Sequence, residues 1–499
     1  MQAFANQRVE SDSRAVMLSI YNDLRRTKET FVPLTPGRVN MYVCGMTVYD
    51  LCHLGHARVM VVFDVVARYL RWLGYEVTYV RNITDIDDKI INRANERGEP
   101  FQALTERFIK AMHEDARALG VLPPDQEPRA TEHLPDITRM IARLIERGHA
   151  YAADNGDVYY DVKSFPDYGH LSGKSIEDLQ SGARVEPGES KRDPLDFALW
   201  KAVKPGEPAW DSPWGAGRPG WHIECSAMST RALGDTFDIH GGGADLTFPH
   251  HENEIAQSEG ATGHPFVRFW MHNGFVRINE EKMSKSLGNF FTIREILKRY
   301  HPEALRLFLL SHHYRGPIDF ADQYINEAEK SLDRFYEFFS LAQEERGELT
   351  VEADSDENEG IRAQPLIQKI EDAMNDDFNT AVVVAHMNEE LRNLNRAMTR
   401  LQKKKGNWAA FDTAASTLKY ACQLLGFLYH EPKDYKARVL DMKKETLGLD
   451  VAQIEALIEQ RKAARETKDW AKADECRDAL AAMGVVLEDN AGGTIWKVK

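Results

Sequence analysis

The sequence predicts an α/β fold: a parallel-sheet domain split by an insertion, followed by an all-α bundle and a small C-terminal α+β domain. Three observations support this prediction. A strand–helix–strand pattern stands near the start, and the same alternation resumes after a long segment broken by Pro and Gly. From Thr292 onward the pattern is almost wholly helical, and it ends in a short hairpin.

The first unit begins with residues 40–46, which are apolar and β-rich. An amphipathic stretch from Gly55 to Leu73 follows, and Gly74 stands where a helix end favours glycine. Residues 75–83 are β-rich again. A unit of this kind implies a parallel, Rossmann-like sheet with ligand sites at the carboxyl ends of its strands.

The second half of the sheet is expected much later in the chain. Helical patterns occupy 101–119 and 135–148, whereas 159–220 is short-patterned, rich in Pro and Gly, and typical of an insertion. The alternation then resumes, with a helix from about Trp221, a strand at 236–240, a helix at 248–258 and a strand at 266–272.

The remaining chain predicts helices separated by polar connections. Residues 346–360 are acidic and poor in apolar side chains, and a second polar connection lies near 430–444. The predicted helices cover 361–376, 379–404, 409–428, 451–467 and 470–482, and the predicted hairpin covers 485–496.

Composition restricts the class of protein. A chain of 499 residues is too long for one core, and 43% apolar with 28% charged residues is typical of a globular protein. The chain contains no run of eighteen apolar residues, so the sequence does not predict a membrane span. Five scattered cysteines indicate a reducing compartment, so we expect a cytoplasmic location.

The charge and the N-terminus leave questions open. A net charge of −15 excludes a uniformly basic surface but permits a local cationic groove. The first sixteen residues contain four charges and no apolar run, so they do not predict a secretory signal. We expect a disordered leader there, with Met17 as an alternative start.

Two short elements are suited to binding phosphate. His53-Leu54-Gly55-His56 opens a predicted helix, where unpaired N–H groups and the helix dipole favour anions. Lys282-Met283-Ser284-Lys285-Ser286 lies between a predicted strand and the helix near Thr292, where two ammonium groups can counter charge on a leaving phosphate. Each element alone is also compatible with a solvated surface segment.

Together these elements resemble the paired HIGH and KMSKS signatures of the class I aminoacyl-tRNA synthetases. Leu54 replaces the usual isoleucine, which is a volume-conserving change. The order of the two elements around a split parallel sheet matches that family.

Four further residues form a candidate metal site. Cys44 ends the first predicted strand, Cys225 lies near the start of the helix from Trp221, and His250 and Glu254 are spaced i, i+4 on a predicted helix. Two thiolates, an imidazole and a carboxylate can bind zinc tetrahedrally. None has the usual close cysteine spacing, and buried cysteines alone are usually structural.

The chain resembles the cysteinyl-tRNA synthetase family from about Met17 to its end. The resemblance is carried by segments 42–45, 47–50, 82–89, 220–225 and 241–246, with the block at 250–254. Met46 stands at a position where many members of this family have proline. The resemblance implies zinc at Cys44, Cys225, His250 and Glu254, with His251 as a competing ligand that the family pattern disfavours.

The same resemblance implies the chemistry. Cysteine and ATP would form cysteinyl-adenylate and pyrophosphate, and the terminal ribose of cysteine tRNA would then accept the cysteine. Zinc would select the substrate thiolate over serine, because shape alone discriminates poorly over so small a difference. Mg²⁺ would accompany ATP. We expect no editing domain and no membrane or DNA partner. We expect the protein to be a monomer.

Residue roles follow from the resemblance. His53 and His56 with Lys282 and Lys285 are the expected catalytic residues. ATP would contact His53, Gly55, His56, Gly243, Asp245 and Lys285, and the cysteine pocket would be shaped by Cys44, Thr47, Thr84 and Trp221. The expected anticodon contacts are Arg465, Trp470, Asp474 and Asp489.

The expected roles divide the chain into eight segments. They are a leader (1–16), the first half of the catalytic domain (17–135), a connective insertion (136–219), its second half (220–275), a lysine-loop and stem-contact region (276–340), a tRNA-binding bundle (341–430), a linker (431–444) and an anticodon-binding domain (445–499).

Two alternatives remain at this point. One is a related enzyme that ligates cysteine to an amino sugar, although such relatives lack a developed anticodon domain. The other is a non-catalytic nucleotide- or tRNA-binding relative, although such proteins typically lack one of the phosphate elements or metal ligands.

Overall fold

The computed structural model describes residues 17–175, 190–278, 281–282, 291–347, 349, 361–403, 406, 408–490 and 493–498. At 281–282, 447, 488–490, 493–495 and 497–498 only the backbone is described. The predicted leader and residues 283–290 of the lysine loop therefore lie outside the described part.

A four-stranded, all-parallel sheet forms the centre of the molecule, in the order β10-β9-β3-β4. The strands are β3 (Arg38–Thr47), β4 (Glu76–Thr84), β9 (Phe237–Gly243) and β10 (Val267–Asn273). The helices between them are α1 (Leu54–Trp72), α6 (Trp221–Leu233) and α7 (Glu252–Thr262), the last preceded by a π-helical turn at Thr247–His251. Two strands come from each predicted half, which confirms the split sheet.

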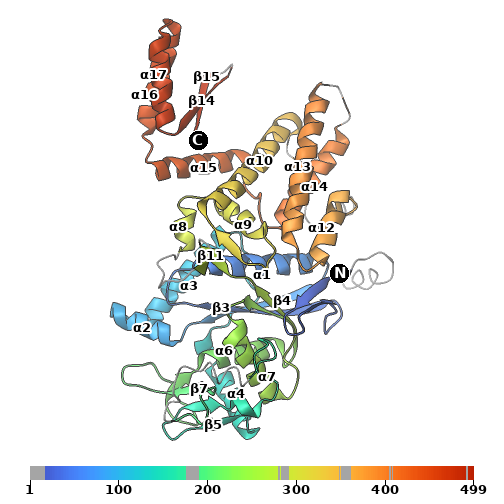
Figure 1. Ribbon diagram of the computed structural model, residues 1–499, viewed down its shortest axis with the longest axis vertical. Coiled ribbons are helices and arrows are strands. Elements are labelled where there is room, and N and C mark those ends of the chain that lie inside the picture. Colours follow the sequence, from blue (N-terminus) through green and yellow to red (C-terminus); the bar gives the residue numbers. More distant parts are fainter. Residues whose placement is uncertain are drawn as a thin grey trace.

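Helix α1 runs across the sheet and is buried along most of its length (Figure 1). Its sequence is rich in Val and other apolar residues because both the sheet and the later helices cover it. Gly74 follows the helix with φ +94°, a conformation that glycine adopts without strain.

The insertion contains its own antiparallel sheet below the central one (Figure 1). Residues 159–220 were expected to form a short-patterned insertion, and the strands within it were not predicted individually. Strands of three to six residues between Pro and Gly give no clear alternation in the sequence, although they pair in the folded chain. The strands are β5 (Ala150–Ala152), β6 (Val158–Tyr160), β7 (Phe197–Ala202) and β8 (Gly217–Pro219).

Other elements flank the two sheets. A hairpin of β1 (Ser19–Asn22) and β2 (Thr27–Thr30) precedes the central sheet, and β11 (Val276–Ile278) pairs with β12 (Glu281–Lys282) and β13 (Ile318–Phe320). The helices are α2 (Asp88–Arg97), α3 (Phe101–Ala118), α4 (Leu134–Glu146), α8 (Ile293–Leu297) and α9 (Pro302–Leu310), with 3₁₀ turns at Ala130–Glu132 and Val162–Ser164.

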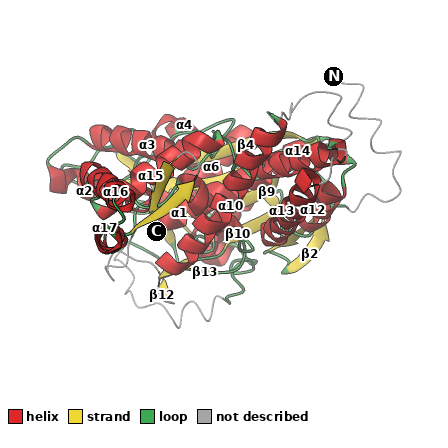
Figure 2. Cartoon of the chain, turned by 90° about the horizontal axis from the view of Figure 1, so that it is seen from above, coloured by secondary structure: helices red, strands yellow, loops and turns green. Residues whose placement is uncertain are grey.

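Helices dominate the C-terminal part, as predicted. They stack above the sheet and lead to a tail at one end of the molecule (Figures 1 and 2). They are α10 (Asp322–Arg346), α12 (Pro365–Asn375), α13 (Thr380–Lys403), α14 (Ala409–Leu424), α15 (Pro432–Leu447), α16 (Val451–Glu466) and α17 (Trp470–Ala482), followed by the hairpin β14 (Val485–Asn490) and β15 (Gly493–Val498).

The predicted linker at 431–444 is largely helix α15 rather than an irregular connection. Its sequence is polar because most of the helix faces solvent, and Tyr435 is one of its few buried side chains. Tyr435 stacks on Tyr336 of α10 with ring centroids 3.7 Å apart. The connection is therefore held against the preceding helices.

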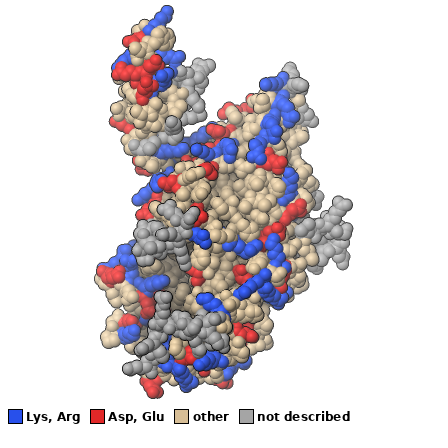
Figure 3. Space-filling view, viewed as in Figure 1, with Lys and Arg blue, Asp and Glu red and all other residues tan. Residues whose placement is uncertain are grey.

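Charge is unevenly distributed on the surface. Lys and Arg side chains gather along α15 and on the neighbouring helices in Figure 3. The α15 cations are Lys433, Lys436, Arg438, Lys443 and Lys444. The net charge of −15 therefore coexists with local cationic surface. None of the described helices is both long enough and apolar enough to cross a membrane.

Candidate active site

A cavity of about 270 Å³ lies where the carboxyl ends of the central strands meet the start of α1. Most of the residues predicted to bind ATP or cysteine line it, although they come from distant parts of the sequence. These residues are Cys44, Thr47, His53, Gly55, His56, Trp221, Gly243 and Asp245. Thr84 is buried at the end of β4, and it is not among the described residues that line the cavity.

The two histidines of the first phosphate element also cap α1. His53 is the N-cap residue, and its Nδ1 accepts a hydrogen bond from the Gly55 N–H at 3.0 Å. The Nδ1 of His56 accepts one from the His53 N–H at 3.2 Å, and the rings stack with centroids 3.7 Å apart. A backbone N–H can only donate, so each neutral ring carries its proton on Nε2. That tautomer is suited to donating to phosphate oxygens.

The residues that directly follow the lysine loop are hydrogen-bonded to the start of α1. The Leu54 N–H donates to the Phe291 carbonyl at 3.2 Å, and the Ile293 N–H donates to the Cys52 carbonyl at 2.9 Å. Helix α8 then begins with a capping box formed by Thr292 and Glu295. The residues that follow the lysine loop are therefore neighbours of the first phosphate element in space. Lys282 ends β12 with only its backbone described, and Lys285 lies outside the described residues.

Gly243 and Asp245 form another part of the cavity wall, at the end of β9. A Cβ at Gly243 would lie 2.5 Å from the Asp245 Oδ1, so a side chain at this position would displace the carboxylate from its present place. The Asp245 side chain is exposed at the cavity. A carboxylate there can accept hydrogen bonds from sugar hydroxyls.

The four predicted metal ligands meet in a buried group beside the cavity, which Cys44 of this group lines. One donor atom from each of Cys44, Cys225, His250 and Glu254 lies within 4.8 Å of the others, and all four residues are buried. Cys44 Sγ is 3.5 Å from His250 Nε2 and 3.3 Å from Glu254 Oε1. His250 Nε2 is 3.1 Å from Glu254 Oε1.

These distances fit a tetrahedral metal ion. Zinc holds sulfur at about 2.3 Å and nitrogen or oxygen at about 2.0–2.2 Å, which places tetrahedral ligand atoms about 3.3–3.8 Å apart. The observed separations of 3.1–3.5 Å lie at or near this range. The donor set also has the softness that zinc prefers over magnesium or calcium.

The electrostatics of the group favour a cation. A hydrogen bond with Cys44 lowers the pKa of the Cys225 thiol to about 7, although burial opposes this shift. Burial disfavours charge on His250, but the adjacent Glu254 and Cys225 raise its pKa to about 10. His240 and His250 overcome burial and hold the pKa of Glu254 well below its usual range. Cys225 and Glu254 are therefore stabilised in their negatively charged forms by positive charge beside them. A bound metal ion can supply that positive charge.

Several histidines around the group were not predicted as site residues. His222 Nδ1 lies 2.9 Å from His250 Nδ1, and His240 Nε2 lies 2.8 Å from Glu254 Oε2. Such outer contacts orient ligands and fix the histidine tautomer. His222 shares a segment with Cys225, but a single histidine carries no sequence pattern that would identify it.

The alternative ligand His251 also lies close to the group. Its Nε2 is 3.8 Å from Glu254 Oε1, and its Nδ1 is 2.8 Å from His272 Nε2. Cys44, His240, His251 and Glu254 form a second possible group that shares two members with the first. The second group has only one sulfur, so the first suits zinc better.

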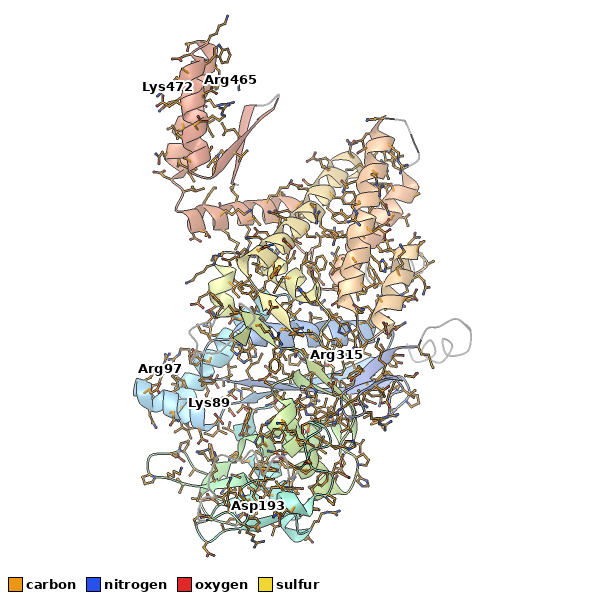
Figure 4. All side chains as sticks on the ribbon, in the orientation of Figure 1. Lys89, Arg97, Asp193, Arg315, Arg465 and Lys472 are labelled. Carbon is orange, nitrogen blue, oxygen red and sulfur yellow. The ribbon has the colours of Figure 1, made fainter. Side chains whose placement is uncertain are left out.

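The predicted anticodon residues lie far from the cavity, on the tail. Figure 4 labels Arg465 and Lys472 there, well separated from Lys89, which lines the cavity. Trp470 is 60% exposed at the start of α17. Asp474 pairs with Arg477 at 3.1 Å. The side chain of Asp489 lies outside the described residues.

Comparisons with known proteins agree along most of the chain. The family model described as the catalytic domain of class I (C) tRNA synthetases matches residues 30–330. A DALR domain matches 369–429, and a cysteinyl-tRNA ligase anticodon-binding domain matches 451–496. The methionyl-tRNA synthetase of Mycobacterium tuberculosis, solved with methionyl-adenylate, shares the fold with a TM-score of 0.55 at 15% identity, over 83% of this chain and 95% of that one.

Similar sequences cover nearly the full length. The cysteine–tRNA ligase of Methylococcus capsulatus is 59% identical over 484 residues, which is 96% of this chain and all of that protein. The cysteine–tRNA ligase of Thioalkalivibrio sulfidiphilus is 60% identical over 482 residues, again 96% of this chain and all of the relative. The chain therefore belongs to the cysteine–tRNA ligase family of class I aminoacyl-tRNA synthetases.

Proposed function

We propose that this ligase first joins L-cysteine to ATP as cysteinyl-adenylate and then transfers the cysteine to the terminal ribose of its tRNA. The observation that carries the proposal is one cavity with two chemically different ends. Cys44 of the predicted metal group lines one part of it, and His53 with His56 lines another at the start of α1.

In the first step the cysteine carboxylate attacks the α-phosphorus of ATP, and pyrophosphate leaves. His53 and His56 donate from Nε2 to phosphate oxygens, and the start of α1 adds its dipole. Asp245 accepts from the ribose hydroxyls. These contacts hold the two reactants in line, which converts a bimolecular reaction into an oriented one.

Lys282 and Lys285 are proposed to counter the charge on the departing pyrophosphate, as the family resemblance implies, with Mg²⁺ accompanying ATP. The attachment of Phe291 and Ile293 to the start of α1 supports this role, because it brings the end of that loop to His53. In the second step the tRNA ribose hydroxyl attacks the carbonyl, and AMP leaves.

Zinc is proposed to be held by Cys44, Cys225, His250 and Glu254. When bound, it would coordinate the substrate sulfur as a thiolate, whereas the hydroxyl of serine stays protonated and binds poorly. Trp221 closes the wall beside this group, with its ring centroid 4.4 Å from that of His250. Cysteine would then be distinguished from serine by the binding of its sulfur to the metal, so a separate editing site is not required.

The proposal is tested by ATP–pyrophosphate exchange with cysteine and with serine, before and after zinc chelation. We expect exchange with cysteine, at least about 10²-fold less with serine, and loss of the cysteine reaction on chelation. Restoration by added Zn²⁺ controls for unfolding. Equal exchange with both amino acids, or full activity without zinc, would contradict the thiolate selection.

The helical bundle and tail are proposed to bind the tRNA, with the chain acting as a monomer. Trp470 supports this proposal, because an aromatic ring that is 60% exposed, on a tail that also carries Arg465 and Lys472, can stack on an unpaired base. The cationic side chains along α15 extend the same kind of surface toward the bundle.

Trp470→Ala should therefore lower kcat/KM for tRNA by about tenfold to a hundredfold, since one stacked base contributes about 1–3 kcal/mol. Cysteine-dependent exchange, which needs no tRNA, should remain unchanged. Aminoacylation at varied tRNA concentration measures the effect. Tyr324→Ala removes another exposed aromatic, 45% exposed on α10, and serves as the control. An equal loss in both variants would argue against base stacking at Trp470.

A further inference from the structure

Arg58 is a fully buried cation that makes no ion pair with any described residue. The other large buried arginines differ in this respect. Arg81 pairs with Glu127, and Arg306 pairs with Asp64. Burial lowers the pKa of Arg58 to about 10, and no neighbouring carboxylate opposes the shift. A buried charge retained without a counterion requires an explanation beyond general stability.

The guanidinium of Arg58 is held by backbone carbonyls from two separate segments. Its Nη1 donates to Gly274 at 2.7 Å and to Phe275 at 2.9 Å. Its Nη2 donates to Tyr314 at 2.9 Å, and also to His313 and Gly316. Only the planar fork of arginine can reach both segments at once, because a lysine ammonium offers its donors from a single atom.

The two segments cross in direct backbone contact where Arg58 binds them. The Gly274 N–H donates to the Tyr314 carbonyl at 2.8 Å, and the Ile318 N–H donates to the Phe275 carbonyl at 3.0 Å. A Cβ at Gly274 would lie 2.3 Å from the Gly316 carbonyl oxygen, so the approach requires glycine. Arg58 thus ties the crossing to α1. Figure 4 labels Arg315 of the second segment, next to α1.

Both ends of this link belong to the cavity. Arg58 lies two residues after His56, in the first turns of α1. The segment from Asn273 to Val276 forms part of the cavity wall, and it continues into β11, which pairs with β12 so that Arg277 faces Lys282. The position of the phosphate-binding histidines relative to this wall therefore depends on the Arg58 contacts.

We propose that Arg58 is a positioning residue for the adenylation step, one that sets the phosphate-binding start of α1 against the Gly274–Val276 wall. This inference rests on the proposed adenylation. The four predicted metal ligands come from β3, α6, the turn before α7 and α7 itself, and Arg58 donates no hydrogen bond to the described residues of these elements. Cysteine binding should therefore be less sensitive to Arg58 than the reaction rate.

Arg58→Lys is the first test. It keeps the charge and loses the fork, so kcat for cysteine-dependent exchange should fall about 10²-fold while KM for cysteine stays close to that of the unchanged enzyme. The matched control is Arg306→Lys. Arg306 is equally buried and donates to the carbonyls of Leu425 and Leu119, but neither of these residues lines the cavity, whereas Gly274 and Phe275 do. This control should lower Tm without the same loss of kcat.

Two further variants separate positioning from folding. In Arg58→Ala, added ethylguanidinium should restore part of kcat, whereas urea at the same concentration should not. Gly274→Ala disturbs the crossing from its other side with Arg58 intact, and it should reproduce the fall in kcat. A normal kcat in Arg58→Lys, or parallel losses of kcat and Tm in Arg58→Lys and Arg306→Lys, would overturn the inference. A lack of cysteine-dependent exchange in the unchanged enzyme would instead contradict the proposed function.

Discussion

Replacing Cys225 by serine is expected to remove most of the bound zinc and to slow cysteine activation by about 10²-fold or more, since even residues that only contact metal ligands cost 10–100-fold when they are lost. The Cys225 sulfur is the group most ready to bind a metal, because the hydrogen bond with Cys44 lowers its pKa to about 7. Serine at this position would stay protonated and would offer a hard oxygen in place of a soft thiolate.

Zinc content per chain, measured by atomic absorption, checks this expectation independently of activity. Exchange with cysteine then measures the consequence. Cys422→Ser is the matched control, because Cys422 is also fully buried but lies in α14, away from the donor group. Retention of stoichiometric zinc with normal exchange in Cys225→Ser would show that this sulfur is not a ligand.

The same assay distinguishes the two overlapping donor groups. His250→Asn should lose zinc, because His250 Nε2 lies 3.1 Å from Glu254 Oε1 and 3.5 Å from Cys44 Sγ. His251→Asn should retain it, because His251 Nε2 is 3.8 Å from the same carboxylate oxygen. The opposite result would assign the metal to the group that contains His240 and His251.

The sequence predicted the central sheet well because its strands are buried on both faces. Each of the four strands was expected within a few residues of its observed position, since continuous β-rich runs stand between glycines and a strongly apolar helix. The split between the two halves followed from the same pattern. The carboxyl ends of these strands then placed Cys44, Gly243 and the start of α1 at one edge.

Elements that lie mostly in solvent were harder to predict. Helix α2 is short and buries only Ile90, Ile91 and Ala94, so few apolar positions mark it in the sequence. Helix α15 was expected to be a polar connection for the same reason. The short strands of the insertion pair with one another over only a few residues each, and such pairing is a property of the folded chain rather than of any local pattern.

The candidate site shows the same division. Cys44 and Cys225 stand far apart in the sequence, and only the family resemblance connected them before the fold brought them together. The contacts of His222 and His240 with the ligands were not predicted, because an isolated buried histidine has no periodicity or spacing. The hydrogen bonds of Arg58 could not be predicted from the sequence either, because its partners are backbone carbonyls, which every residue type carries.

His56→Ala should lower kcat for cysteine-dependent exchange by about 10²–10³-fold, the usual cost of losing one donor that stabilises transition-state charge. The hydrogen bond from the His53 N–H fixes Nδ1 as an acceptor, so Nε2 is the donor that the phosphate would lose. KM for cysteine should change little, because the predicted metal group does not involve His56.

The cap and the donor can be separated, because they use different atoms of the His56 ring. His56→Asn places an acceptor near the position of Nδ1 and keeps the cap on α1, yet it has no group at Nε2, so it should be as slow as His56→Ala. His56→Gln can place an amide N–H near the position of Nε2 and should recover part of kcat. Steady-state exchange at varied ATP measures all three variants. Recovery by asparagine but not by glutamine would mean that His56 acts by capping α1, and the phosphate contact would then have to come from His53 and the lysine loop.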